Sequence, residues 1–217
     1  MQKFNNKKII IWDWNGTLLN DANFCVMCMN KVLSKRQLQR IDVEQYRNLF
    51  TFPVKDYYEA IGFNFDLEDF EVPAMEFIDL YYPNLDMASL HAEAKDVLLF
   101  FSKLGFRQLV LSAMEHSNLV KSLTDKGIIS FFDDISGIND HYAVSKLEMG
   151  KNMITKLGVP RSEILIIGDT IHDFEVALGL GVDCILVTNG HQSRERLLKT
   201  TPNVLSQLKD VTNLFQS

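Results

Sequence analysis

The chain has 217 residues and a mass of 24.9 kDa, which suits one domain with a modest insertion. A hydrophobic content of 47% excludes a largely disordered protein, and a net charge of −6 excludes a nucleic-acid or anionic-membrane binder that works through bulk charge. No apolar stretch reaches the ~18 residues that suggest a membrane span. We therefore expect a soluble, cytoplasmic protein, with a monomer as the default state.

Short apolar runs recur along the chain, and each ends in polar or turn-forming residues. They predict strands at residues 8–12, 108–111, 164–167 and 184–187, with a weaker candidate at 134–136. Helical patterns lie between them, at residues 92–104, 118–126, 146–157 and 173–180. This alternation predicts an α/β fold with a doubly wound parallel sheet, in which ligands bind beyond the carboxyl ends of the strands.

The region between the first two predicted strands breaks the alternation. It is rich in Phe, Tyr and Met, and it shows helical patterns at residues 24–38, 43–50, 54–61 and 72–82. We predict a helical cap at residues 21–90, inserted into a core formed by residues 1–20 and 91–217. An insert placed directly after the first strand's loop is positioned to cover the site.

Polar side chains collect where the predicted strands end. Asp13, Ser112 and Asp169 each follow a strand, and Lys146 begins a helix. Two carboxylates are suitable ligands for Mg²⁺, which prefers oxygen donors, and an ammonium and a hydroxyl can hold a phosphate group. The backbone amides after Asp13 can form a phosphate-binding nest. Lys151 rivals Lys146, because it also lies near the start of that helix.

Taken together, the segment from Asp13 to Leu18 (DWNGTL), Ser112, Lys146 and the segment from Gly168 to Asp173 (GDTIHD) resemble the haloacid dehalogenase superfamily. The resemblance covers nearly the whole chain. It is to the phosphatase branch with a helical cap, and within that branch to phosphoglycolate-phosphatase-like hydrolases.

The resemblance implies a Rossmann-like core and a Mg²⁺-dependent phosphomonoester hydrolase that acts on a small phosphorylated metabolite. Asp13 is then the nucleophile that forms an aspartyl phosphate, and the metal ligands are Asp13, Asp169 and the backbone carbonyl of Asn15. Thr17 and Asp173 support these groups. The implied catalytic residues are Asp13, Asn15 and Lys146, and the implied phosphate contacts are Trp14, Asn15, Ser112, Ala113 and Lys146.

Asn15 departs from the family pattern, which has an Asp acid/base at this position. A carboxamide has no titratable proton near neutral pH, and general acid–base help is worth about 10²–10⁴-fold in rate. Three outcomes stay open: a slow phosphatase or one suited to good leaving groups, a substitute acid/base from the cap or from His172, or lost turnover. Deamidation of the Asn15-Gly16 pair to an aspartate is a further, weaker idea.

Other functions are weaker matches to the sequence. A phosphate-binding or regulatory relative with little turnover is the non-enzyme alternative, and Asn15 is the feature that favours it. A phosphonatase ranks lower, because no context marks Lys31, Lys35 or Lys55 as the Schiff-base lysine it needs. A dehalogenase is disfavoured, because such enzymes do not use the metal that Asp169 and Asp173 would serve.

Overall fold

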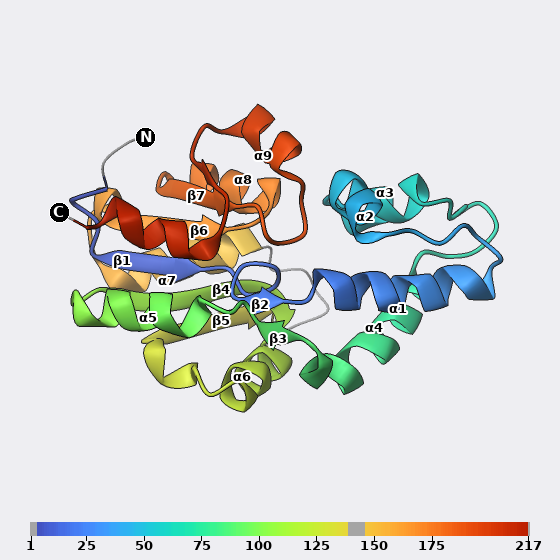
Figure 1. Ribbon diagram of the computed structural model, residues 1–217, viewed down its shortest axis with the longest axis horizontal. Helices are drawn as coiled ribbons and strands as arrows, with labels where there is room; N and C mark the ends of the chain where they lie inside the picture. The colour runs from blue at the N-terminus through green and yellow to red at the C-terminus, as the bar shows by residue number, and fades with distance from the viewer. Residues whose placement is uncertain (1–3, 139–145, 217) are drawn as a thin grey trace.

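The computed structural model describes residues 4–138 and 146–216. Within these ranges the core is a six-stranded parallel sheet with the order β5-β4-β1-β6-β7-β8 (Figure 1). The strands are β1 (Ile9–Trp12), β4 (Arg107–Glu115), β5 (Asp134–Ile138), β6 (Ile164–Gly168), β7 (Asp183–Val187) and β8 (Val204–Leu205). The predicted α/β fold with a doubly wound parallel sheet is confirmed.

β1 occupies the middle of the sheet, and all four of its residues are buried. Such an uninterrupted apolar run is typical of a parallel strand that is covered on both faces. Its last residue, Trp12, is in register with Val110 of β4 and Ile167 of β6. Asp13 and Asp169 therefore leave adjacent strands at the same edge of the sheet.

Helices cover both faces of the sheet (Figure 1). One face packs against α5 (Ala94–Lys103), α6 (His116–Asp125) and the 3₁₀ helix η4 (Leu208–Leu214). The other packs against α7 (Lys146–Leu157), α8 (Ile171–Leu180) and α9 (Arg194–Thr200). The side chains of β1 alternate between the two hydrophobic clusters, with Ile10 and Trp12 in the first and Ile9 and Ile11 in the second. Short 3₁₀ turns, η2 (Ile129–Phe131) and η3 (Arg161–Glu163), precede β5 and β6.

A second group of helices lies beyond the carboxyl end of β1 (Figure 1). It consists of α1 (Ala22–Lys35), α2 (Val43–Leu49), α3 (Val54–Ala60), α4 (Glu71–Tyr81) and η1 (Tyr82–Met87), which we call the cap. The chain enters the cap through β2 (Leu19–Asn20) and leaves it through β3 (Ser89–Leu90), and these two strands pair antiparallel. The domain division at residues 20 and 91 stays a prediction.

Two features of the core differ from the sequence-based expectation. β4 does not end at Ser112 but continues to Glu115, because its register with β5 shifts between Leu111 and Glu115. Ser112 therefore lies at an irregularity inside the strand rather than after it. β8 and α9 follow Val187 without having been predicted. Among the described residues, no helix is long and apolar enough to cross a membrane.

Candidate active site

The loop after β1 turns sharply and places Asp13 in a buried position, with 7% of the residue exposed. The amides of Leu18 and Leu19 both donate to the Trp14 carbonyl and close the turn. The Thr17 hydroxyl lies 3.2 Å from Asp13 Oδ2 and 3.1 Å from Asp169 Oδ1, so it links the two carboxylates. The turn thus holds Asp13 against the end of β6.

Gly16 is required in this turn for two reasons. Its φ of +74° lies in the left-handed region that favours glycine. A Cβ atom at this position would also overlap the Asp169 carboxylate. Any larger residue at position 16 would displace Asp169 from Asp13, so the glycine in the DWNGTL segment has a direct geometric role.

Lys146 bridges two carboxylates at the bottom of the site. Its Nζ lies 2.5 Å from Asp13 Oδ1 and 2.6 Å from Asp173 Oδ1, and the side chain is 6% exposed. Burial by itself would lower the pKa of Lys146, but the two carboxylates raise it above its ordinary value, so the ammonium is a fixed cation. Lys151, the rival considered above, is half-exposed and pairs with Glu148 instead.

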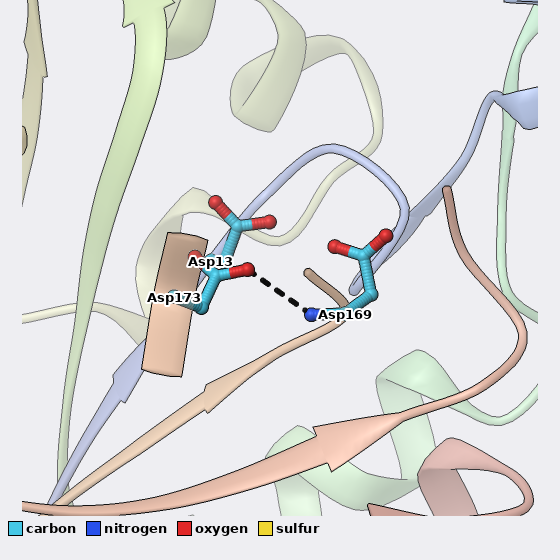
Figure 2. Close-up of side chains that lie close together, drawn as sticks. All are labelled: Asp13, Asp169 and Asp173. Carbon is cyan, nitrogen blue, oxygen red and sulfur yellow. Dashed lines mark hydrogen bonds between the residues drawn. The ribbon is translucent and has the colours of Figure 1, made fainter. Parts of the chain in front are cut away.

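Asp13, Asp169 and Asp173 form one acidic cluster (Figure 2), in which one oxygen from each carboxylate lies within 4.8 Å of the others. Burial raises the pKa of Asp13 to about 6 although Lys146 opposes the shift, and burial raises that of Asp169 to about 8 although His191 opposes it. The mutual repulsion of the carboxylates adds to both shifts. The cluster thus carries more negative charge than its protein partners offset.

The three carboxylates differ in how many hydrogen bonds they accept from protein donors. Asp173 caps α8: its Oδ2 accepts from the amides of Asp169 and Thr170 (3.2 and 3.0 Å) and from the Thr170 hydroxyl (2.7 Å), and its Oδ1 accepts from Lys146. Burial opposes ionisation of Asp173, but Lys146 and the two hydrogen bonds from Thr170 together lower its pKa below the ordinary value. Asp173 is therefore occupied by protein donors, which suits a supporting role.

The donor set of the cluster fits a hard divalent cation such as Mg²⁺. Asp13 and Asp169 are buried, adjacent and short of counter-charge, and carboxylate oxygens are the ligands that Mg²⁺ prefers. Asp13, Asp169 and the Asn15 carbonyl are the residues that would hold the ion. Supplying two positive charges there would relieve the repulsion that raises the pKa of Asp13 and Asp169.

The predicted phosphate contacts lie beside this cluster. Ser112, Ala113, Asn15 and Lys146 all line one cavity, and the Ser112 hydroxyl accepts from the Met114 amide at 3.1 Å. The Trp14 side chain does not reach the cavity. Its ring is wholly buried in the core, so this residue has only main-chain groups to offer to a phosphate.

Asp21, a wholly buried residue next to Asn15, was not predicted from the sequence. The Asn15 amide nitrogen donates to Asp21 Oδ2 (2.8 Å) and to the Tyr81 hydroxyl (2.7 Å), and Tyr81 donates to the same carboxylate (2.6 Å). The Gly16 amide donates to Asp21 Oδ1 at 2.9 Å. Asn15 is thus held by the cap through Tyr81 and by the start of α1 through Asp21.

His191, from the loop after β7, completes this network. Its Nε2 lies 3.2 Å from Asp21 Oδ1, its Nδ1 lies 2.9 Å from the Tyr46 hydroxyl, and its amide donates to Asp169. Burial opposes ionisation of both side chains, but their attraction lowers the pKa of Asp21 to about 2 and raises that of His191 to about 9. The two form a buried ion pair. Its partners are far apart in the sequence, and no local motif marks them.

His172, which we considered as a substitute acid/base, lies at the rim of the same cavity. Its ring lies against Phe52 with centroids 4.7 Å apart, and its Nδ1 is 3.6 Å from Glu175 Oε2. Among the described residues, it makes no hydrogen bond or ion pair with Asn15 or Asp13. The residue that reaches Asn15's neighbourhood is His191, through Asp21.

The cap rests directly on the core through α2 and the residues that follow it. Arg47 donates to the Gly190 carbonyl at 2.9 Å, while Gln192 and Arg196 donate to the Phe50 carbonyl at 2.9 and 2.5 Å. The cavity between cap and core has a volume of about 220 Å³. Main-chain carbonyls accept most of these bonds, so the docking depends on the backbone position of the α2–α3 segment.

The family model for haloacid dehalogenase-like hydrolases matches residues 10–187. The fold resembles a haloacid dehalogenase-like hydrolase from Streptococcus pneumoniae (TM-score 0.84, 20% identity, 97% of this chain and 99% of that one). It also resembles a predicted phosphoglycolate phosphatase from Haemophilus somnus (0.80, 19%, 97% and 99%) and protein tyrosine kinase A from Mycobacterium tuberculosis (0.81, 20%, 97% and 99%). At these identities the likeness concerns the fold alone.

A search of curated protein sequences finds no match. The family match spans β1 to β7, which carry Asp13, Ser112 and Asp169, and it includes Lys146 at the start of α7. Because the matched segment covers more than half of the chain and the solved structures share its architecture, the chain belongs to the haloacid dehalogenase-like hydrolase family.

Proposed function

We propose that the protein is a Mg²⁺-dependent phosphatase that hydrolyses a small phosphorylated metabolite in the cytoplasm through an aspartyl-phosphate intermediate. The observation that carries the proposal is the buried bridge from Asp13 through Lys146 to Asp173, with Asp169 in the same cluster. The proposal is further supported by the shared position of these four residues in the lining of one cavity, where Asp13 would act as the nucleophile, Lys146 as a fixed cation, and Asp13 with Asp169 as metal ligands. Phosphoryl transfer at such a site depends on the position of the nucleophile and on compensation of the negative charge of the phosphate.

In this proposal, Asp13 attacks phosphorus and displaces the alcohol oxygen, and water then releases inorganic phosphate from Asp13. Lys146 offsets the charge of the phosphoryl group, and the Ser112 hydroxyl donates a hydrogen bond to it. When bound, Mg²⁺ supplies the positive charge that lets an anionic nucleophile approach an anionic ester. The cap excludes bulk water from the cavity.

Asn15 makes the proposed enzyme a slow one for ordinary alkyl esters. Its side-chain nitrogen is committed to Asp21 and Tyr81, and an amide cannot give a proton to the leaving oxygen. The same position cannot remove a proton from the water of the second step. The phosphoryl group on Asp13 should therefore be long-lived compared with that of an enzyme with a carboxylate here.

The second candidate function is phosphate-ligand binding with little turnover. The committed hydrogen bonds of Asn15 favour it, because they stabilise a side chain that does no acid/base work. A phosphonatase is less well supported: Lys146 is the only lysine among the described residues lining the cavity, and it is paired with two carboxylates. Neither Lys35 nor Lys55 lines that cavity. Lys35 pairs with Glu76, and Lys55 lies over the ring of Phe65.

Phosphate release from a panel of small phosphomonoesters, with and without Mg²⁺, tests the proposal. We expect Mg²⁺-dependent release that is lost in Asp13→Asn and kept in Asp133→Asn, a control at an exposed carboxylate that pairs with Arg107. Stabilisation of the fold by inorganic phosphate without any release would favour the binding function. Activity that survives in Asp13→Asn would contradict the nucleophile assignment.

A further inference from the structure

The cap side of the cavity has an unusual composition for a site that receives an anionic substrate. Apart from Asp21 at the start of α1, which is paired with His191, the lining residues supplied by the cap are aromatic, aliphatic or sulfur-containing, and none of them is charged. Phe50, Phe52, Tyr57, Tyr58 and Phe77 are among them. This half of the cavity receives the organic part of the substrate, because the core side holds Asp13 and Lys146.

Each cation that lines the cavity in the described structure already has a partner. Lys146 is bound between Asp13 and Asp173, and His191 pairs with Asp21 at 3.2 Å. A second anionic group on the substrate would therefore lie against aromatic rings without a counter-charge. Burying such a group unpaired is costly, so the cavity discriminates against it.

The chemistry of the leaving group points to the same class of substrate. Asn15 cannot protonate the departing oxygen, so that oxygen must leave as an anion. A phenol has a pKa of about 10, whereas an aliphatic alcohol is a far weaker acid, nearly as weak as water. An aryl oxygen can thus depart unaided: the bond from Asp13 Oδ to phosphorus forms, the bond from phosphorus to the aryl oxygen breaks, and the phenoxide takes a proton from water.

Tyr57 offers an independent observation. Its ring packs edge-to-face against Tyr46, Phe50 and Tyr58, with centroids 5.6, 5.4 and 5.8 Å apart. Tyr57 lines the cavity, and its buried hydroxyl has no hydrogen-bond partner in the described structure. The surrounding rings favour an aromatic ligand.

We propose that the substrate is a small phosphomonoester of an uncharged aromatic alcohol, with the ring against the cap and no second anionic group. This inference rests on the phosphatase function above and names its substrate class. The docked cap and the modest cavity favour a small molecule over a phosphorylated protein side chain. Phosphoglycolate, which carries a carboxylate next to its phosphate ester, is then a poor substrate.

The test uses matched esters with the unaltered protein and Mg²⁺. Phenyl phosphate should exceed 4-carboxyphenyl phosphate in kcat/KM by about tenfold or more, because the added carboxylate lies without a counter-charge, although it makes the phenoxide a slightly better leaving group. It should exceed cyclohexyl phosphate by about 10²-fold, because the ring size is similar but the alkoxide leaves without a proton donor. Faster hydrolysis of 4-carboxyphenyl phosphate or phosphoglycolate would overturn the substrate class and leave the phosphatase function standing. Faster hydrolysis of a phosphotyrosine peptide would overturn the restriction to small substrates.

A cap variant tests the charge argument directly. Val54, at the first turn of α3, lines the cavity and is half-buried, so Val54→Arg places a cation in the uncharged wall. We expect the ratio of the two phenyl esters to shift towards the carboxylated one by about tenfold. Val72→Arg, at a 47% exposed position of α4 that does not line the cavity, should leave the ratio unchanged. An unchanged ratio in Val54→Arg would contradict the inference.

A binding measurement separates failure of the inference from failure of the proposed function. Phenylphosphonate should raise the unfolding temperature more than phosphonoacetate does, whether or not the protein turns over. If no ester is hydrolysed but this preference holds, the phosphatase function is wrong and the cavity's aromatic preference stands. If phosphonoacetate stabilises the protein more, the inference is wrong irrespective of turnover.

Discussion

The core and the cap contribute opposite chemistry to one cavity. The core side presents four buried charged groups close together, Asp13, Lys146, Asp169 and Asp173, each fixed by hydrogen bonds from neighbouring strands and loops. Apart from Asp21, which is paired with His191, the cap side presents uncharged side chains that hold one another through ring contacts such as that between Tyr46 and Tyr57.

The difference separates two tasks. On the core side a single lost partner leaves an uncompensated buried charge, which is costly, so that half has few tolerated substitutions. On the cap side the packing is non-directional, so one ring can replace another at modest cost if the volume is kept. Under the proposed function, catalysis therefore depends on the core, and the choice of substrate depends on the cap.

The largest effect is expected from a change in the core charge network. Lys146→Met removes the cation between Asp13 and Asp173 and should lower kcat/KM by about 10³-fold or more, because the phosphoryl charge is no longer offset. Lys151→Met is the matched control on the same helix and should stay near the unaltered value, because Lys151 pairs with Glu148 at the surface and does not line the cavity. Equal losses in both variants, measured by phosphate release, would show that Lys146 has no special role.

Asn15→Asp is expected to raise turnover of alkyl phosphates by about 10²-fold, because it restores a group that can carry a proton. The structure adds a complication, since the new carboxylate would face Asp21 in place of an amide donor. The double variant Asn15→Asp with Asp21→Asn restores a hydrogen bond between the two positions, with the amide at position 21 as the donor and the carboxylate at position 15 as the acceptor. If neither variant gains activity while both stay folded, another acid/base is already in place.

Loss of a charged group from the cavity wall should lower the free energy of unfolding more than loss of an uncharged hydroxyl. His191→Phe removes the cation that faces Asp21 and should lower the free energy of unfolding by about 3 kcal/mol. Tyr57→Phe removes a hydroxyl without a partner and should change it by about 0.5 kcal/mol or less. Chemical denaturation of both variants measures the difference. A smaller loss for His191→Phe than for Tyr57→Phe would reverse the comparison between the two halves.

The smallest expected effect is the response of the fold to Mg²⁺. An ion that binds only the folded state stabilises it by about 2.7 kcal/mol at 100 times its Kd, visible as a rise in unfolding temperature. Asp169→Asn should abolish that rise, and Asp183→Asn, outside the cavity, should keep it. A Mg²⁺-induced rise that persists in Asp169→Asn would place the ion elsewhere.

The parts of the fold that could be predicted are those with a local sequence pattern. The apolar run of β1 and the periodicity of α7 are continuous in the sequence, and the glycine turn after Asp13 has a recognisable spacing. β8 is only two residues long, which is too short for a periodic signal, and the extension of β4 depends on a register shift with β5. Those features arise from pairing between strands, which no single segment encodes.

The same distinction applies to the site. Asp13, Lys146 and Asp169 lie in motifs, so their residue types and order indicated them. The pair formed by Asp21 and His191 was missed, because its members become adjacent only when the loop after β7 meets the start of α1. Tyr46 lies 145 residues before His191 in the sequence. A buried polar network of this kind is specified by the tertiary fold, and its members have no characteristic spacing in the sequence.

The central claim is that Asp13 is the nucleophile, and acid-quenched peptide mass spectrometry during turnover of phenyl phosphate tests it most directly. Because Asn15 cannot activate water for the second step, we predict a Mg²⁺-dependent phosphoryl group on Asp13 that accumulates in the unaltered protein and is less abundant in Asn15→Asp. Hydrolysis that proceeds with no phosphoryl group on Asp13, or with one on a different residue, would contradict the account.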